Sequence, residues 1–293
     1  MLLAIYPAAV VGAEEGPKPQ TLFTNVNIFD GKNDALSEGM SVLVEGNFIK
    51  KVAKGEIEAR DDATVIDGGG RTLMPGLIDS HVHFYLSMGG GRIGMETSRW
   101  DYFPAMGAAA AQEWLADGFT TVRDMGGMLD GLRKVIDAGL LDGPRMYLAG
   151  STISQTSGHG DTLLDGQMGP GENNLARLGL FVVADGPEEI RKAARKSFSY
   201  GATIIKIMMG GGVAGAKSPM FAPQYTNTEI KAAVEEAASR DVYVAAHIYN
   251  DEQIKRALNL GVKSIEHGQF ISEETAILLK EKGGLSAPSW PQS

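Results

Sequence analysis

Two histidines, His81 and His83, stand at the end of an apolar segment with one residue between them. The segment Leu77 to Val82 is predicted to form a strand, and residues two apart on a strand project to the same side. Both imidazoles would therefore face one side of a sheet. A His-x-His pair at a strand end is typical of a divalent-metal site, although two structural histidines would give the same pattern.

Two further histidines also end apolar segments: His247 follows residues 242–246, and His267 follows residues 264–266. The carboxyl ends of parallel barrel strands meet on one rim, where barrel enzymes place their active sites. Core packing is a poor explanation for four of the five histidines of the chain ending predicted strands. Because the chain has no cysteine, a metal there must be held by nitrogen and oxygen ligands.

A lysine, Lys206, lies inside the apolar segment 204–209. Lysines at strand ends commonly extend toward water, which is one interpretation. A desolvated lysine instead has a lowered pKa, and its neutral amine is nucleophilic. Such an amine could capture carbon dioxide as a carbamate, whose two oxygens can bridge two metals. Beside four strand-end histidines, we favour the carbamate.

Two weaker candidates lie in loops on the same predicted rim. His159 belongs to a glycine-rich loop, residues 157–161, which equally suits a solvated turn. Tyr225 follows the fourth predicted strand and is expected to be exposed. We consider His159 for a carbonyl or carboxylate contact with substrate, and Tyr225 for a contact with the far end of the substrate.

The elements that must position these residues alternate between strand and helix after residue 70, which predicts an α/β fold. The predicted strands are residues 77–82, 120–123, 146–149, 204–208, 242–246 and 264–266, and the helices are residues 105–116, 129–138, 187–200, 228–239, 251–260 and 272–282. About six strand–helix units fit an incomplete TIM-type (β/α)8 barrel, with a doubly wound sheet as the rival. The expected barrel region is 71–284, and two prolines favour an irregular tail over 285–293.

The region 21–70 reads as a partial accessory β domain, with a hairpin turning at Gly46. Residues 1–20 read as a signal peptide and linker, although a buried strand or an early start codon is an alternative for the apolar residues 2–13. A signal peptide would make the protein periplasmic or secreted, and otherwise it would be cytoplasmic. The net charge of −9 argues against a nucleic-acid partner. We expect no stable membrane insertion after processing and leave homo-oligomerisation open.

The segment Pro75 to His83, together with Lys206, His247 and the Glu266-His267-Gly268 triplet, resembles the amidohydrolase superfamily. The resemblance is greatest to its imidazolonepropionase-like branch, which includes metal-dependent Xaa-Pro dipeptidases (prolidases), and it extends from Leu22 to Lys282. It implies a TIM-type barrel with a small N-terminal β-sandwich-like domain. It also implies two divalent ions, with zinc as the default. His81 and His83 would bind the more buried ion, His247 and His267 the second, and a carboxylated Lys206 would bridge both.

The same resemblance implies hydrolysis of an amide-type C–N bond in a small substrate, an Xaa-Pro-type dipeptide or a cyclic amide, by a metal-bridged hydroxide. The family's proton-shuttling Asp ends strand 8, and no residue of this chain matches it, because the predicted pattern stops before strands 7 and 8. Two alternatives stay open. One is a non-catalytic fragment that lacks this Asp, and the other is a mononuclear deaminase, which needs no bridging lysine.

Overall fold

The computed structural model describes residues 16–86, 91–162, 173–213 and 218–288. The chain divides into two compact units between Pro75 and Gly76. The predicted signal-peptide segment, residues 2–13, and the last residues of the predicted tail, 289–293, lie outside the described residues. Within the described part of the chain, no helix is both long and apolar enough to cross a bilayer.

The first unit is a five-stranded sheet in the order β3-β2-β1-β4, with β5 also paired to β1. Its strands are β1 (Gln20–Ile28), β2 (Ser37–Glu45), β3 (Phe48–Lys54), β4 (Thr64–Asp67) and β5 (Thr72–Leu73). The hairpin predicted at Gly46 is confirmed: β2 and β3 are antiparallel, and Gly46 has a positive φ of 62° that a tight turn requires. We expected a sandwich-like domain, whereas the described strands form one sheet.

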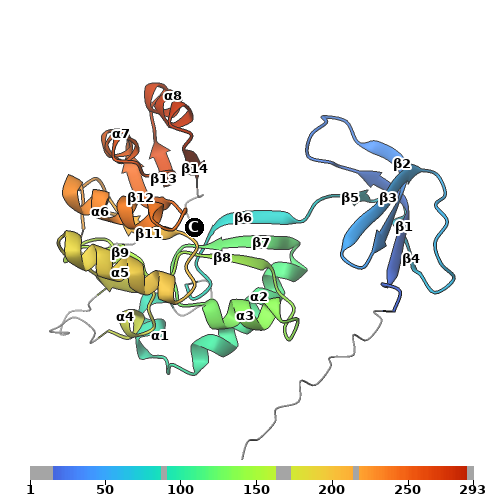
Figure 1. Ribbon diagram of the computed structural model, residues 1–293, viewed down its shortest axis with the longest axis horizontal. Coiled ribbons are helices and arrows are strands. Elements are labelled where there is room, and N and C mark those ends of the chain that lie inside the picture. Colours follow the sequence, from blue (N-terminus) through green and yellow to red (C-terminus); the bar gives the residue numbers. More distant parts are fainter. Residues whose placement is uncertain (1–15, 87–90, 163–172, 214–217, 289–293) are drawn as a thin grey trace, which may run out of the picture. The chain divides into compact units, whose positions relative to one another are not determined.

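The second unit alternates strands and helices, so the predicted α/β class is confirmed (Figure 1). Its strands are β6 (Leu77–Val82), β7 (Phe119–Asp124), β8 (Arg145–Leu148), β9 (Thr152–Ser154), β10 (Phe181–Val183), β11 (Ile205–Met208), β12 (Val244–Asn250), β13 (Ser264–Phe270) and β14 (Leu285–Ala287). They form a three-stranded sheet, β6-β7-β8, and a six-stranded sheet, β10-β9-β11-β12-β13-β14. Every strand pair of these two sheets is parallel.

Hydrogen bonds continue from one sheet into the other at β11. Just before β11, the N–H of Thr203 donates to the carbonyl of Leu148 on β8 at 2.7 Å, and within β11 Ile207 pairs with Ile153 of β9. The chain between β8 and β9 therefore bends while keeping the same neighbour. The sheet that contains β6 is thereby connected to the sheet that contains β11, β12 and β13.

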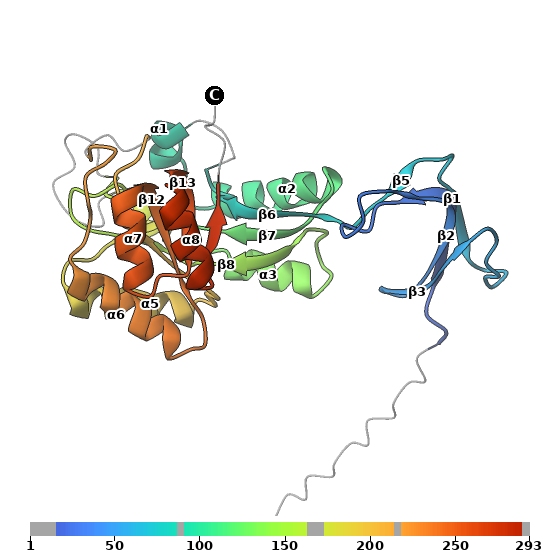
Figure 2. The ribbon, with the colours of Figure 1, turned by 90° about the horizontal axis from the view of Figure 1, so that it is seen from above.

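The helices are α1 (Gly91–Thr97), α2 (Tyr102–Ala116), α3 (Asp130–Asp137), α4 (Asn174–Arg177), α5 (Pro187–Ser199), α6 (Asn227–Ala238), α7 (Asp251–Asn259) and α8 (Glu273–Glu281). All six predicted helices are present, and Figure 2 shows α5 to α8 along the outside of the six-stranded sheet. Helix α6 begins with a capping box, in which Thr226 and Glu229 each bond the other's backbone N–H. Pro187 occupies the start of α5, as predicted.

The predicted irregular tail is wrong at its beginning. Leu285 to Ala287 form β14, which pairs in parallel with β13 and adds one strand to the expected pattern. The glycines after α8 return the chain to the sheet, where the N–H of Leu285 donates to the carbonyl of Lys263 at 2.7 Å. Pro288 follows the three paired residues, so its ring removes no donor from the ladder.

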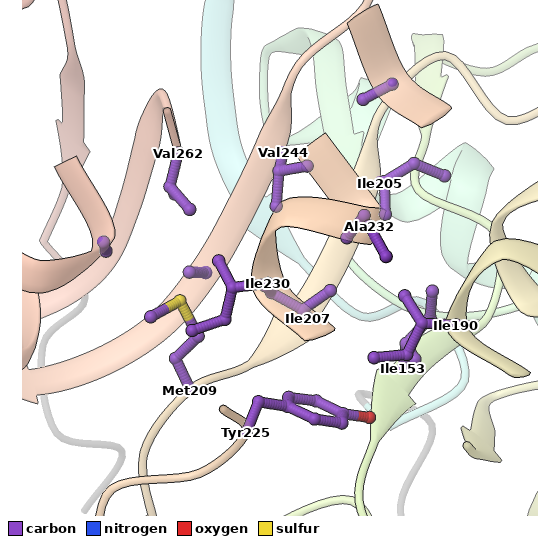
Figure 3. Packing of buried hydrophobic residues seen from close by; sticks show 14 of the residues in the cluster. Ile153, Ile190, Ile205, Ile207, Met209, Tyr225, Ile230, Ala232, Val244 and Val262 are labelled. Carbon is purple, nitrogen blue, oxygen red and sulfur yellow. The ribbon is translucent and has the colours of Figure 1, made fainter. Parts of the chain in front are cut away.

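The main hydrophobic core lies between the six-stranded sheet and its helices. β-branched side chains from the sheet pack against alanines and isoleucines of α5, α6 and α7, and examples are Ile153, Ile190, Ile205, Ile207, Ile230, Val244 and Val262 (Figure 3). Burying each such side chain contributes roughly 1.5–3 kcal/mol. This apolar layer holds β11, β12 and β13 against the helices and so positions the polar residues that these strands carry.

Candidate active site

Four histidines predicted as metal ligands lie side by side. The ring centroids of His81 and His83 are 5.2 Å apart, those of His81 and His267 4.8 Å, and those of His247 and His267 4.4 Å. The residues come from β6, from the position just after it, from β12 and from β13. Strands that the sequence separates by more than a hundred residues thus converge as expected.

Burial keeps these imidazoles neutral, the form that binds a metal. Desolvation lowers the pKa of His81 and of His267 to about 2. It also holds the pKa values of His83 and His247 well below the usual range. Four neutral nitrogen donors in a buried cluster suit a divalent cation.

Lys206 lies in the middle of β11 and is 1% exposed. Among the described residues, its Nζ has no hydrogen-bond partner. The pKa of Lys206 falls to about 8, chiefly because of burial; the positive charge of Arg123 also lowers it, and the negative charges of Glu266 and Asp124 oppose the fall. A buried amine without a partner is costly, so its presence calls for a chemical explanation.

Asp124, at the end of β7, was not among the predicted site residues. Its carboxylate accepts the backbone N–H groups of Phe84 at 2.8 Å and of Gly126 at 2.9 Å, which fixes the turn directly after His83. Burial raises the pKa of Asp124 to about 7, against the effect of these two donors. Its place at a strand end was visible in the sequence, but its contact with the turn after His83 depends on the register of β6 and β7.

His159, the weaker candidate for a substrate contact, lies beside the histidine cluster. Its ring stacks on that of His247 at a centroid distance of 4.3 Å and an interplanar angle of 22°. Its buried Nδ1 has no hydrogen-bond partner among the described residues, and burial lowers the pKa of His159 to about 4. Gly212 packs against this ring: an added Cβ would lie 2.1 Å from His159 Cε1.

Tyr225 has a different environment from the exposed one that we expected. It is 7% exposed, and Figure 3 shows its ring within the hydrophobic core. Its hydroxyl donates to the carbonyl of Ala184 at 3.1 Å, and its N–H donates to Gln155 Oε1 at 2.6 Å. A loop residue can be buried when the loop folds back over the sheet, as this one does. We therefore assign Tyr225 to core packing.

The donor set fits divalent metal ions by its chemistry. It offers neutral imidazoles from His81, His83, His247 and His267, together with the amine of Lys206, which has no partner in the part of the chain that the structure describes. Among the described residues, however, no three His, Asp or Glu side chains are arranged around one point as metal ligands would be. The identity and number of the ions, and the role of each ligand, therefore remain predictions.

The chain belongs to the amidohydrolase family, whose model matches residues 72–284. This match confirms the family predicted from the histidines and Lys206, and it supports a hydrolase of the class that acts on carbon–nitrogen bonds. The match covers the second unit up to residue 284, and the whole cluster lies within that range.

Among proteins of known sequence, the ochratoxinase of Aspergillus niger is 38% identical over 227 residues, which cover 72% of this chain and 46% of that protein. Among solved structures, a prolidase complexed with N-methylphosphonate-L-proline is 35% identical with a TM-score of 0.85, over 92% of this chain and 66% of that one. A Xaa-Pro dipeptidase with bound methionine is 33% identical with a TM-score of 0.79, over 91% and 66%. The chain thus spans about half the length of the curated relatives that it matches.

Proposed function

We propose that this protein is a binuclear, metal-dependent amidohydrolase that cleaves an amide-type C–N bond. The observation that carries the proposal is the Nζ of Lys206, which has no hydrogen-bond partner among the described residues and lies near enough to four neutral histidines to lower their pKa values. A buried lysine in such a position is poorly explained as a structural residue. As a carbamate it would acquire two oxygens that could each bind a cation, and the burial cost would be offset.

In this proposal His81 and His83 would hold one ion, His247 and His267 would hold the other, and a carboxylated Lys206 would contribute ligand oxygens to both. When bound, two divalent ions, zinc by default, supply a hydroxide nucleophile at neutral pH and polarise the scissile carbonyl. His159, which stacks on His247, would donate to the carbonyl or carboxylate of the substrate. The buried cluster excludes bulk water, which strengthens each of these contacts.

The proposed substrates are Xaa-Pro-type dipeptides, or cyclic amides in their place. Support comes from the similarity to a prolidase solved with a phosphonate derivative of proline and to a Xaa-Pro dipeptidase. The 38% identity to an ochratoxinase extends the range to be tested to ochratoxin. We also propose that the second unit is part of a (β/α)8 barrel, to which this chain contributes the strands from β6 to β14.

Hydrolysis of a panel of Xaa-Pro dipeptides, a cyclic amide and ochratoxin, with zinc and bicarbonate present, tests the proposal. We expect turnover of at least one member that is lost in His81→Asn and in Lys206→Ala. Retained turnover in Lys206→Ala would contradict the bridging role of Lys206, and bound metal without a carbamate on Lys206 would favour the alternative, a mononuclear deaminase. Turnover by no member in a chain that binds the metal would indicate the other alternative, a non-catalytic fragment.

A further inference from the structure

A buried carboxylate, Glu266, connects the histidine cluster to an arginine. His81 Nδ1 lies 2.6 Å from Glu266 Oε2, and Arg123 Nη2 donates to Glu266 Oε1 at 2.8 Å and to Oε2 at 2.9 Å. Ser264 Oγ donates to Oε1 at 2.6 Å. The side chain of Glu266 is fully buried and that of Arg123 is 11% exposed. Such short, charge-assisted bonds are stronger than neutral ones.

Arg123 in turn is held by several strands. Its Nε donates to the carbonyl of Ser80 on β6 at 2.5 Å. Its Nη1 donates to the hydroxyls of Tyr243 and Ser264, each at 3.1 Å. Arg123 lies on β7 in the three-stranded sheet, whereas Ser264 and Glu266 lie on β13 in the six-stranded sheet. The guanidinium therefore bridges the two sheets and fixes Glu266 in one orientation.

The donors around Glu266 determine which nitrogen of His81 carries the proton. A carboxylate can only accept, and Glu266 already accepts from Arg123 and Ser264 as an ion-paired carboxylate. The neutral ring of His81 must therefore donate from Nδ1–H. Its lone pair is then on Nε2, the nitrogen that remains for a metal ion.

We propose that Glu266, held by Arg123, is a positioning residue that fixes His81 as the Nδ1–H tautomer and so prepares Nε2 as a metal ligand. The inference rests on the proposed metal-dependent function for its purpose. Neither Arg123 nor Glu266 would touch the metal or the substrate. The alternative is that the pair only braces the two sheets, and stability measurements alone would not separate these roles.

Two variants and one control separate positioning from bracing. Glu266→Gln removes the charge at constant shape. The double variant Arg123→Met with Glu266→Met replaces the ion pair by apolar side chains of similar volume, which is often neutral for stability. The control is Glu236→Gln, because Glu236 also pairs with an arginine, Arg195, at 2.5 Å, but on helices α5 and α6 outside the sheet.

The experiment measures the His81 tautomer in the metal-free chain by nitrogen NMR, and zinc affinity by competition with a chelator. We expect wild type and Glu236→Gln to keep the Nδ1–H tautomer. We expect both site variants to lose it and to bind zinc about 10–100-fold more weakly, the usual effect of removing such a partner. A folded double variant with wild-type tautomer and zinc affinity would overturn the proposal. If wild type binds no zinc, the proposed function fails, and the tautomer comparison still decides the role of Glu266.

Discussion

At the scale of single residues, burial of Lys206 carries a free-energy cost in the metal-free site. Its amine is buried without a partner in the described structure, and burial depresses its pKa from 10.5 to about 8. A folded-state pKa below the unfolded value means that the unfolded chain binds more protons between these two values. The stability of the metal-free protein should therefore rise as the pH increases from about 8 to 10.5.

Lys206→Met should accordingly stabilise the metal-free chain at pH 7 by about 3 kcal/mol, a gain that shrinks as the pH rises above 8. Urea unfolding at pH 7 and 9.5, in buffer free of carbon dioxide, measures this difference. The control Lys192→Met alters an exposed lysine on α5 and should change stability little at either pH. A difference between Lys206→Met and wild type that is the same at both pH values would contradict the burial argument.

His159 should be displaced by a methyl group at Gly212, because the new Cβ would overlap the imidazole. We expect Gly212→Ala to raise KM for the best substrate about tenfold, the cost of one lost hydrogen bond. Gly210→Ala is the matched control, since its nearest neighbour outside the adjoining residues is 3.7 Å away. Steady-state kinetics of both variants test this expectation. Equal KM values for Gly212→Ala and Gly210→Ala would show that His159 does not bind the substrate.

At the scale of elements, the turn after β7 is packed directly against the turn after β6. A Cβ at Gly126 would lie 2.6 Å from Thr152 Oγ1 and 3.2 Å from His83 Nδ1. Only glycine permits this close approach. It places the backbone after β7 against His83, the predicted metal ligand directly after β6. The site thus depends on strand register as well as on residue type.

Gly126→Ala should destabilise the fold by about 1–3 kcal/mol through overpacking. Gly131→Ala, in open space on α3, should stabilise it by about 0.5 kcal/mol through helix propensity. Thermal unfolding of the two variants shows directly whether each substitution raises or lowers the stability of the fold. Destabilisation by Gly131→Ala, or none by Gly126→Ala, would show that the packing argument is wrong.

Elements with a clear hydrophobic period and a recognisable helix cap could be predicted from the sequence. Elements that depend on tertiary contacts could not. The six long helices and the strands that carry His81, His247 and His267 follow from local pattern, although β12 and β13 each continue three residues past the histidine. Strands β9, β10 and β14 have three residues each, too few for a period, and exist because a neighbouring strand pairs with them. The partnership of Arg123 with Glu266 joins strands 143 residues apart, and no local pattern encodes it.

At the scale of the whole molecule, two sheet edges of the second unit carry exposed apolar side chains. Ile78 on β6 is 70% exposed and Leu285 on β14 is 58% exposed. Strand edges with unpaired backbone groups and apolar side chains favour association. We expect the chain to form larger species as its concentration rises.

The double variant Ile78→Lys with Leu285→Lys should reduce this association several-fold, because charged side chains block edge pairing. Leu140→Lys alters a still more exposed leucine, 79% exposed, in the loop after α3, and serves as the control. Light scattering across a concentration series measures the mass. Equal association of the control and the edge variant would place the contact elsewhere.

The central claim is that the four histidines and Lys206 assemble a binuclear metal site. Elemental mass spectrometry of the folded chain, supplied with zinc and bicarbonate, tests it most directly. We predict about two zinc ions per chain, with a clear loss in Lys206→Ala and no loss in Lys192→Ala. A folded wild-type chain without stoichiometric metal, or a Lys206→Ala variant that keeps both ions, would contradict the account.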